Sequence, residues 1–253
     1  MNILIWGLGG KMGKIVKSIV DETEGLTLVG GVDKFADPTQ FNVPVFRNAI
    51  EINTKVDVLI DFSRPDALTE ILSYATSNKV ACVLCTTGYS DEQENQIKEV
   101  SKLIPIFRSS NMSIGVNLMV ELCKKAAQLL GNDFEVEIIE QHHNQKVDAP
   151  SGTALTIANA INEEFNNSKT FIYGRSSKNQ KRDRNEIGIH AVRGGTIVGK
   201  HDALFIGQDE IVTIAHEAQS KAVFAKGAVR AAIFIGQNKE AGLYNMKDLI
   251  ASV

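Results

Sequence analysis

An apolar run that ends in a glycine-rich turn opens the chain, and this feature restricts the possible folds more than any other. Residues Asn2–Trp6 have the pattern of a buried strand, and the turn Gly7-Leu8-Gly9-Gly10-Lys11-Met12-Gly13 leads into the amphipathic stretch Lys11–Glu22. Glycines at such a turn let the backbone approach a pyrophosphate closely, while the helix amides face the anion. The sequence therefore predicts a dinucleotide-binding strand, turn and helix.

The glycine spacing departs from the usual one, so a downstream acid matters to the prediction. The usual motif has its third glycine at the sixth position, where this chain has Met12; here the glycines fall at Gly7, Gly10 and Gly13. Asp33 follows Gly13 by 20 residues, after a second apolar run, where a carboxylate can hold the adenine-ribose hydroxyls. A purely structural glycine turn is the alternative that these residues leave open.

Apolar runs alternate with amphipathic ones through the first hundred residues, which is typical of βαβ units. Because the runs are continuously apolar, we expect their strands to be buried on both faces of a parallel sheet. Pro65 can start one of the intervening helices at its first position. The further strands predicted are Leu26–Val32, Val56–Asp61, Val80–Leu84 and Ile104–Phe107, with another helix at Asp91–Lys102.

The pattern changes after residue 110, which predicts a second domain. The charged stretch Ser176–Glu186 is expected to be an exposed loop, and strand-like runs separated by Gly-Gly and Gly-Gln-Asp-Glu turns indicate a mixed or antiparallel sheet. A final helix, Lys221–Ile235, and a short tail are expected to close the chain. The other elements predicted here are helices at Gly115–Leu130 and from a Ser151 cap to Glu164, and strands at Phe134–Gln141, Ile187–Val192, Thr196–Phe205 and Ile211–His216.

Charge and composition exclude several functions. A formal net charge of -3 and a pI near 6.0 argue against nucleic acid as the main partner, although a local basic cluster could still bind an anionic substrate. The nearest candidate for a membrane span, Ala222–Ile235, carries Lys226 and Arg230, so no membrane association is expected. Three cysteines and no apparent leader predict free thiols and a cytoplasmic location.

The segment Glu140–Ala154 carries the most chemistry. His142, His143 and Lys146 directly follow a predicted strand, and Ser151-Gly152-Thr153 begins a predicted helix. Histidine and lysine can exchange a proton, while hydroxyls and unpaired helix amides suit a carboxylate or a phosphate. Surface histidines beside a plain helix cap are one alternative, and a zinc site is another, although adjacent histidines suit a single metal poorly.

Taken together, the motifs resemble the dihydrodipicolinate reductase family over essentially the whole chain. The resemblance rests above all on His142–Ala154; the other matching motifs are Gly7–Gly13, Asp61-Phe62-Ser63-Arg64-Pro65, Thr86-Thr87-Gly88, Asn111 with Ser113 to Asn117, and Gly227-Ala228-Val229-Arg230. It implies NAD(P)H-dependent reduction of 4-hydroxy-tetrahydrodipicolinate to tetrahydrodipicolinate, in the diaminopimelate and lysine pathway.

The resemblance also implies an architecture. A Rossmann-like, doubly wound parallel-sheet domain would comprise residues 1–112 and 230–253. An α+β mixed-sheet domain, residues 113–229, would bind the substrate and form a homotetramer through its sheet.

By the same resemblance, His142 is the catalytic acid/base, Lys146 donates a proton as hydride arrives, and no metal is expected. The small dicarboxylate substrate would be held by His143, Ser151, Gly152 and Thr153. Asp33 would repel the extra phosphate of NADPH and Lys34 would attract it, so both cofactors are expected to work, with NADH modestly preferred. The expected cofactor-binding residues are Gly7, Gly10, Lys11, Met12, Gly13, Asp33, Lys34, Phe62, Ser63, Arg64, Thr86, Thr87, Gly88, Ser110, Met112 and Arg230.

Two positions depart from the family pattern. Cys85 stands where the family usually has glycine, and Met112 where many members carry phenylalanine near the nicotinamide. Cys82-x-x-Cys85 could form a redox pair, but core or loop thiols are the favoured interpretation. Other functions that remain open are an amino-acid dehydrogenase acting on a substrate such as aspartate, a nicotinamide-sensing regulator, and a metal hydrolase built on the histidines.

Overall fold

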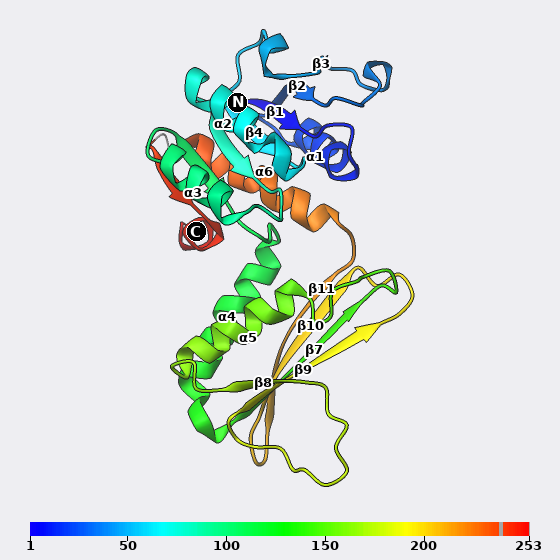
Figure 1. Cartoon of the computed structure of the whole chain (residues 1–253), viewed down its shortest axis with the longest axis vertical. Helices are drawn as coiled ribbons and strands as arrows, with labels where there is room; N and C mark the ends of the chain where they lie inside the picture. Colours follow the sequence, from blue (N-terminus) through cyan, green and yellow to red (C-terminus); the bar gives the residue numbers. More distant parts are fainter. Residues whose placement is uncertain (238–239, 253) are drawn as a thin grey trace. The chain divides into compact units, whose positions relative to one another are not determined.

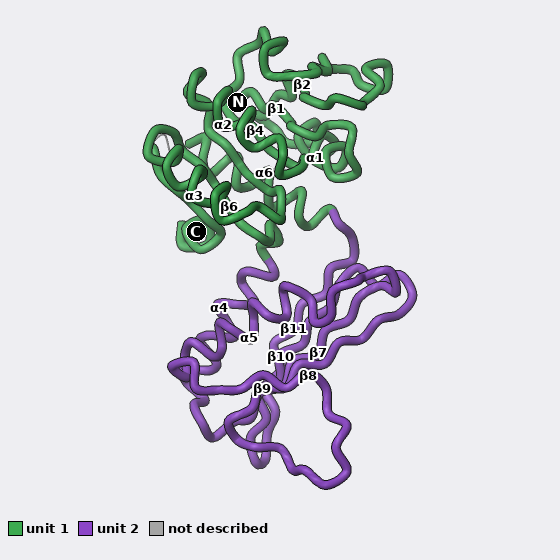
Figure 2. The backbone as a smooth tube through the Cα atoms, in the orientation of Figure 1, with its two compact units in different colours: residues 1–114, 222–253 green, residues 115–221 purple. Residues whose placement is uncertain are grey.

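The structure is a computed structural model that describes residues 1–237 and 240–252 (Figure 1). The chain divides into two compact units, unit 1 (Met1–Ile114 with Ala222–Val253) and unit 2 (Gly115–Lys221) (Figure 2). The chain returns from unit 2 to unit 1 between Lys221 and Ala222, which is earlier than the 229/230 boundary expected from the sequence. The reason is α6 (Ala222–Gln237), a continuous helix whose buried residues pack into the core of unit 1.

Unit 1 is built on a seven-stranded sheet in which every pairing is parallel, with the order β12-β6-β5-β4-β1-β2-β3. This confirms the predicted doubly wound sheet. Because β1 lies between β2 and β4, the strand order reverses there, and such sheets bind ligands at the carboxyl ends of the strands beside the reversal. The strands are β1 (Asn2–Trp6), β2 (Thr27–Val32), β3 (Val45–Phe46), β4 (Val58–Asp61), β5 (Ala81–Leu84), β6 (Pro105–Arg108) and β12 (Gly242–Tyr244).

Helices cover both faces of this sheet and produce two separate cores. Residues of α1 and α6 pack against one face, and residues of α2 pack against the other. Ser90 begins α3 with a reciprocal capping box to Gln93, which explains the abrupt start of that helix. The helices are α1 (Lys11–Glu22), α2 (Leu68–Asn78), α3 (Asp91–Val100), α6 and α7 (Met246–Ala251), with short 3-10 turns at Pro38–Gln40, Ala49–Glu51 and Pro65–Ala67.

The sequence predicted only a short tail after the final helix. This prediction was wrong in part, because the segment contains a strand and a helix. β12 adds a parallel edge strand beside β6, and α7 follows with its own capping box at Asn245. Three residues are too few for a periodic pattern, so main-chain pairing with β6 defines β12. The short strand β3 was missed for the same reason.

Unit 2 has a five-stranded sheet with the order β11-β10-β7-β9-β8. The sheet is mixed, which confirms the prediction of a mixed or antiparallel sheet. β7 pairs with β9 in parallel and with β10 antiparallel. The strands are β7 (Glu135–His142), β8 (Thr170–Tyr173), β9 (Glu186–Arg193), β10 (Gly199–Ile206) and β11 (Ile211–Ala218), and the helices are α4 (Ile114–Leu130), the 3-10 turn Gly131–Asp133 and α5 (Gly152–Glu164).

Burial alternates strictly along β7, so the sheet of unit 2 has an inner and an outer face. The inner face packs against α4 and α5 through an apolar core that includes Ile138, Ile157 and Phe205 (Figure 1). Glu140 and His142 lie on this inner face, because they share the parity of Ile138 along the strand. Two polar groups are therefore buried at the end of an apolar row.

Candidate functional site

The glycine turn of unit 1 has no room for side chains at its key positions. Gly7 has a φ of +84°, and a Cβ at Gly13 would lie 2.2 Å from the Gly7 carbonyl oxygen. Gly10 is the N-cap of α1 and makes no side-chain cap hydrogen bond to its first turn. A close backbone turn before uncapped helix amides fits a pyrophosphate, so the residues present fit a dinucleotide.

Asp33 joins the glycine turn to the loop that follows β2. Its carboxylate accepts hydrogen bonds from the backbone amides of Gly9, Phe35 and Ala36, each at 2.9 Å. The guanidinium of Arg47 donates to the carbonyls of Asp33 and Ala36 at 2.9 and 2.8 Å. The sequence did not single out Arg47, because nothing local distinguishes an arginine in a loop.

A buried carboxylate connects the two loops that carry the expected nicotinamide-side residues. Asp61, at the end of β4, accepts hydrogen bonds from the amide and hydroxyl of Ser63 and from Tyr89 Oη. Thr86 Oγ1 also accepts the Ser63 amide, at 3.1 Å. Burial raises the pKa of Asp61, against the opposing effect of these hydrogen bonds. The loops after β4 and β5 are thus bonded together at the carboxyl edge of the sheet.

The remaining expected cofactor residues differ in exposure. Met112 is buried in the core of unit 1, whereas the others lie mostly at the surface. Those classed as exposed are Lys11, Lys34, Arg64, Thr87, Gly88, Ser110 and Arg230.

The cysteines are all free and buried. Burial raises the pKa of Cys82 and Cys85, which disfavours their thiolates, and therefore fits the interpretation as core thiols.

A hollow of about 1180 Å³ lies at the opposite edge of this sheet. It is lined where the parallel strands begin, by residues that include Leu26, Asp57 and Pro105. Ligands of doubly wound sheets bind at the carboxyl ends of the strands. The glycine turn, and not this hollow, therefore lies at the edge where such sheets bind their ligands.

In unit 2, one buried carboxylate organises the predicted catalytic segment. Glu140 is 0% exposed, and its Oε2 lies 2.6 Å from His142 Nδ1. Both its oxygens accept from the Arg193 guanidinium, each at 2.7 Å, and Oε1 also accepts the Ser151 amide at 2.9 Å. Burial alone would raise the pKa of Glu140, but the bonds from Arg193, His142 and Ser151 lower it overall.

Ser151 is the N-cap of α5, as predicted, and its Oγ accepts the Ala154 amide at 3.2 Å. The same Oγ lies 3.0 Å from His201 Nε2. His201 is 4% exposed, and its ring meets that of His142 edge-on at 5.2 Å. Burial lowers the pKa of His201 to about 4 and also lowers that of His142, although Glu140 opposes the second shift.

Glu140, Arg193 and His201 also belong to this cluster, although the sequence did not single them out as site residues. The alternating pattern of β7 could have placed Glu140 beside His142. His201 lies directly opposite Glu140 in the pairing of β10 with β7, and that pairing cannot be derived from local pattern.

The other predicted residues of this segment lie in the loop after β7. Lys146 Nζ forms an ion pair with Asp148 Oδ1 at 2.7 Å, and the Lys146 amide donates to the His143 carbonyl. His143 and Thr153 are half-buried, while Gly152 has open space where a Cβ would stand. A Cβ at Gly199 would lie 3.0 Å from His142 Nε2. A glycine at this position keeps that ring nitrogen clear of a neighbouring side chain.

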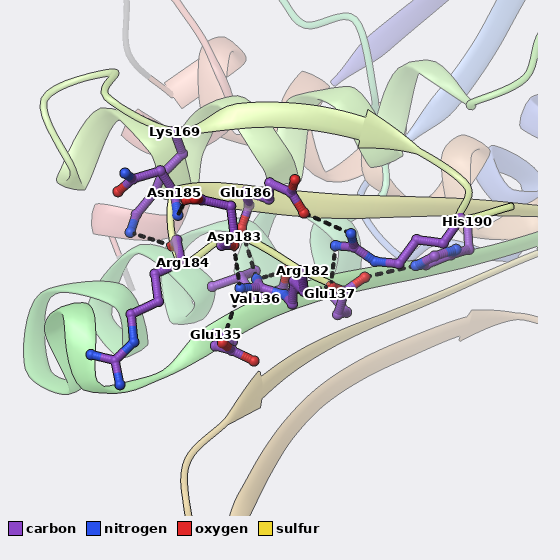
Figure 3. Close-up of polar contacts among 11 residues, drawn as sticks. Glu135, Val136, Glu137, Lys169, Arg182, Asp183, Arg184, Asn185, Glu186 and His190 are labelled. Carbon is purple, nitrogen blue, oxygen red and sulfur yellow. Dashed lines mark hydrogen bonds and ion pairs between the residues drawn. The ribbon is translucent and has the colours of Figure 1, made fainter. Parts of the chain in front are cut away.

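A second charged cluster lies on the outer face of the same sheet. Glu137 accepts from His190 Nε2 at 2.7 Å, from Arg175 at 2.8 Å and from Arg182 at 2.9 Å (Figure 3). Its carboxylate lies over Gly188, where a Cβ would clash at 1.8 Å. The loop before β9, expected to be merely exposed, is therefore held to the sheet by its arginines.

Two kinds of feature do not occur among residues 1–237 and 240–252. No helix in this part of the chain is long and apolar enough to cross a membrane. Within the same residues, no group of three or more His, Cys, Asp or Glu side chains is arranged to hold a metal ion.

Comparison with known proteins gives matches over almost the whole chain. The family models for dihydrodipicolinate reductase match residues 1–112 for the N-terminus and 115–250 for the C-terminus. The chain is 48% identical to a 4-hydroxy-tetrahydrodipicolinate reductase of Clostridium novyi, over 99% of this chain and 98% of the relative. A reductase of the same name from Caldanaerobacter subterraneus has the same identity and coverage.

Among solved structures, the chain is similar to a dipicolinate-bound dihydrodipicolinate reductase from Paenisporosarcina sp. TG-14. The TM-score is 0.81 with 28% identity, and 97% of each chain is covered. A probable dehydrogenase from Thermotoga maritima, with a TM-score of 0.66 and 11% identity, covering 100% of this chain and 93% of its own, shares the fold alone.

Proposed function

The chain belongs to the dihydrodipicolinate reductase family of NAD(P)H-dependent oxidoreductases, and from this premise we propose that it reduces 4-hydroxy-tetrahydrodipicolinate to tetrahydrodipicolinate. The full-length match to reductases of that name is the observation that carries the proposal. It favours this reaction over the aspartate-type dehydrogenase, the regulator and the metal hydrolase that the residues alone left open.

The test is a spectrophotometric assay of NADH and NADPH oxidation with freshly generated 4-hydroxy-tetrahydrodipicolinate. We expect turnover with both nucleotides, and competitive inhibition by dipicolinate, the ligand of the Paenisporosarcina relative. An enzyme that binds either nucleotide but shows no turnover would overturn the proposal.

The roles proposed in unit 2 follow the chemistry of its side chains. His142 serves as the acid/base, and its Nδ1 contact with Glu140 supports this by leaving Nε2 beside Gly199. Lys146 donates a proton to the substrate and must exchange its partner Asp148 for that purpose. The substrate carboxylates are held by His143, Ser151, Gly152 and Thr153, since the first turn of α5 offers amides to an anion.

The nucleotide would be held at the carboxyl edge of unit 1 and would supply the hydride. Gly7, Gly10 and Gly13 shape the turn, with Lys11 and Met12 at the phosphates. Residues Phe62, Ser63, Arg64, Thr86, Thr87 and Gly88 line its nicotinamide side, together with Ser110, Met112 and Arg230. The bonding of the β4 and β5 loops through Asp61 supports this grouping.

Both NADH and NADPH serve in this proposal, with NADH preferred by no more than about tenfold, or ~1.4 kcal/mol. Asp33 repels the additional phosphate of NADPH, whereas the exposed Lys34 attracts it. Lys34→Ala should therefore weaken NADPH more than NADH, and added salt should do the same. Lys55→Ala, whose ammonium pairs with Asp57 at the amino edge of the sheet, is the matched control. A hundredfold preference for NADPH in the unaltered protein would contradict this placement of Asp33.

We further propose a homotetramer assembled through the outer face of the unit 2 sheet. Apolar side chains support this, because Ile206 and Ile211 face each other across β10 and β11, and Ile211 is largely exposed. Light scattering should give about four times the chain mass of 27.6 kDa.

A cytoplasmic location is also proposed, since three free buried thiols suit a reducing compartment.

A further inference from the structure

The carboxylate of Glu140 receives donors from three separate elements of unit 2. His142 belongs to β7 itself, Arg193 ends β9, and Ser151 caps α5. Four contacts of 2.6 to 2.9 Å converge on its two oxygens. A fully buried carboxylate with this many donors fixes the relative positions of all three groups.

We propose that Glu140 is a positioning residue for the reduction, which sets the tautomer of His142 and aligns the start of α5 with it. An ionised carboxylate can only accept hydrogen bonds, so the proton of neutral His142 must sit on Nδ1. Nε2 is then the nitrogen that exchanges a proton. The contact with Glu140 holds the ring in one orientation, as buried acids do for catalytic histidines elsewhere.

The surroundings of the ring agree with this orientation. A Cβ at Gly199 would come within 3.0 Å of Nε2, so the glycine keeps space beside the exchanging nitrogen. The edge of His201 limits rotation of the His142 ring from another side, at 5.2 Å. Arg193 balances the charge of Glu140, so the carboxylate orients the imidazole without converting it permanently to imidazolium.

Glu140→Gln is the discriminating variant, because the amide has nearly the same shape but presents a donor to one of its neighbours. A donor facing Nδ1 forces the proton onto Nε2, the wrong tautomer. We expect kcat to fall by about 10²- to 10⁴-fold, with the KM for substrate changed by less than about fivefold. Glu137→Gln, three residues away on the outer face of β7, is the matched control and should keep kcat within about threefold.

A double-mutant cycle separates positioning from general damage. If Glu140 acts through His142, then adding Glu140→Gln to His142→Gln should cost less than about threefold more in kcat, since residues acting as a unit are non-additive. Full multiplication of the two effects would overturn the proposal. The pH dependence of kcat gives a second readout. The carboxylate of Glu140 raises the pKa of His142 against the effect of burial, so its loss should lower that pKa. The limb of the kcat profile that reports His142 should therefore move to lower pH in Glu140→Gln.

Nitrogen-15 NMR of the histidine rings tests the tautomer directly in the full chain with NADH bound. We expect a protonated Nδ1 and a bare Nε2 for His142 in the parent protein, and the reverse in Glu140→Gln. The same tautomer in both proteins would overturn the proposal. The inference rests on the proposed function, but this measurement needs no turnover, so failure of the reaction and failure of the tautomer assignment are distinguishable.

Discussion

Glu140 and Glu137 lie three residues apart on β7, point to opposite faces of the same sheet, and are each bonded to a histidine and to arginine. The inner carboxylate, 0% exposed, adds the Ser151 amide at the start of α5. The outer one, with 15% of its side chain exposed, adds the second arginine of the loop before β9. The same set of groups therefore organises a site on one face and fastens a loop on the other.

The two clusters differ in burial and in the third group bonded to the glutamate, which is the Ser151 amide for Glu140 and a second arginine for Glu137. On the inner face, low exposure lowers the pKa of His142 and His201, which favours neutral imidazoles there. On the outer face, the arginines and His190 lower the pKa of Glu137 against its own burial, which favours a permanent ion-pair cluster. A histidine beside a glutamate is thus not sufficient to mark a reactive site.

The largest expected effect that sharpens this comparison is the pH dependence of stability. The pKa of His201 is about 4 in the folded protein, against the ordinary histidine value of 6.5, so its contribution to stability is complete above pH 6.5 and is lost as pH falls towards 4. That difference corresponds to about 3 kcal/mol. The charged or titratable groups facing the ring are His142, Glu140, His216 and Lys146.

His201→Leu should therefore flatten the fall in the free energy of unfolding between pH 6.5 and 4, measured by urea titration at each pH. The remaining slope would come from His142 and His216, whose pKa values are lowered mainly by burial, and at the acid end from Glu137 and Glu140, whose pKa values are lowered, against the effect of burial, by their hydrogen-bond partners. Equal slopes in the parent and the variant would show that the inner face does not hold His201 neutral.

Removing either carboxylate should cost different amounts of stability. Glu140→Ala leaves Arg193, with only 19% of its side chain exposed, without its counter-charge, so we expect a loss of about 3 kcal/mol. Glu137→Ala should cost about 1 kcal/mol, because Arg175 keeps its ion pair with Glu186 and Arg182 keeps its ion pair with Glu135. Denaturant unfolding measures both, and similar losses would break the comparison.

The two histidines should differ in their effect on turnover. His142→Gln should lower kcat at least ~100-fold, the low end for lost acid/base help, whereas His190→Gln should leave it within about twofold. Lys146→Ala should behave like His142→Gln, and His143→Ala should chiefly raise KM. Steady-state kinetics with 4-hydroxy-tetrahydrodipicolinate measure these effects. Near-normal kcat in both His142→Gln and Lys146→Ala would contradict the proposal that the inner face carries the reactive groups.

Local patterns were enough to predict most elements and the residues of continuous motifs. Helix α1 and the Ser151 cap of α5 follow from neighbouring residues, and both agree with the structure. Glu140 and His201 could not be paired in advance, because their contact depends on the register between β7 and β10. Edge strands β8 and β12 were missed because main-chain pairing, not side-chain period, defines them.

The smallest expected effect concerns the loop before β9. Arg175 and Arg182 reach Glu137 from residues without regular structure, and Arg182 also donates to the carbonyls of Val136 and Glu186. Glu137→Gln removes one charge from contacts that are partly solvated, so the free energy of unfolding should fall by no more than about 1 kcal/mol. The loop loses part of its attachment to β7 in this variant, and should therefore open more often.

Limited trypsin digestion measures that opening, because Lys178, Lys181 and Arg184 lie in the exposed part of the loop. Cleavage there should be several-fold faster in Glu137→Gln than in the parent, and should accelerate further with salt in the parent, since screening weakens partly exposed pairs. Glu140→Gln serves as the control: its carboxylate contacts the other face, so it should leave this cleavage rate unchanged. Faster loop cleavage in Glu140→Gln, with none in Glu137→Gln, would mean that the two clusters are not separated by the sheet in the way their contacts indicate.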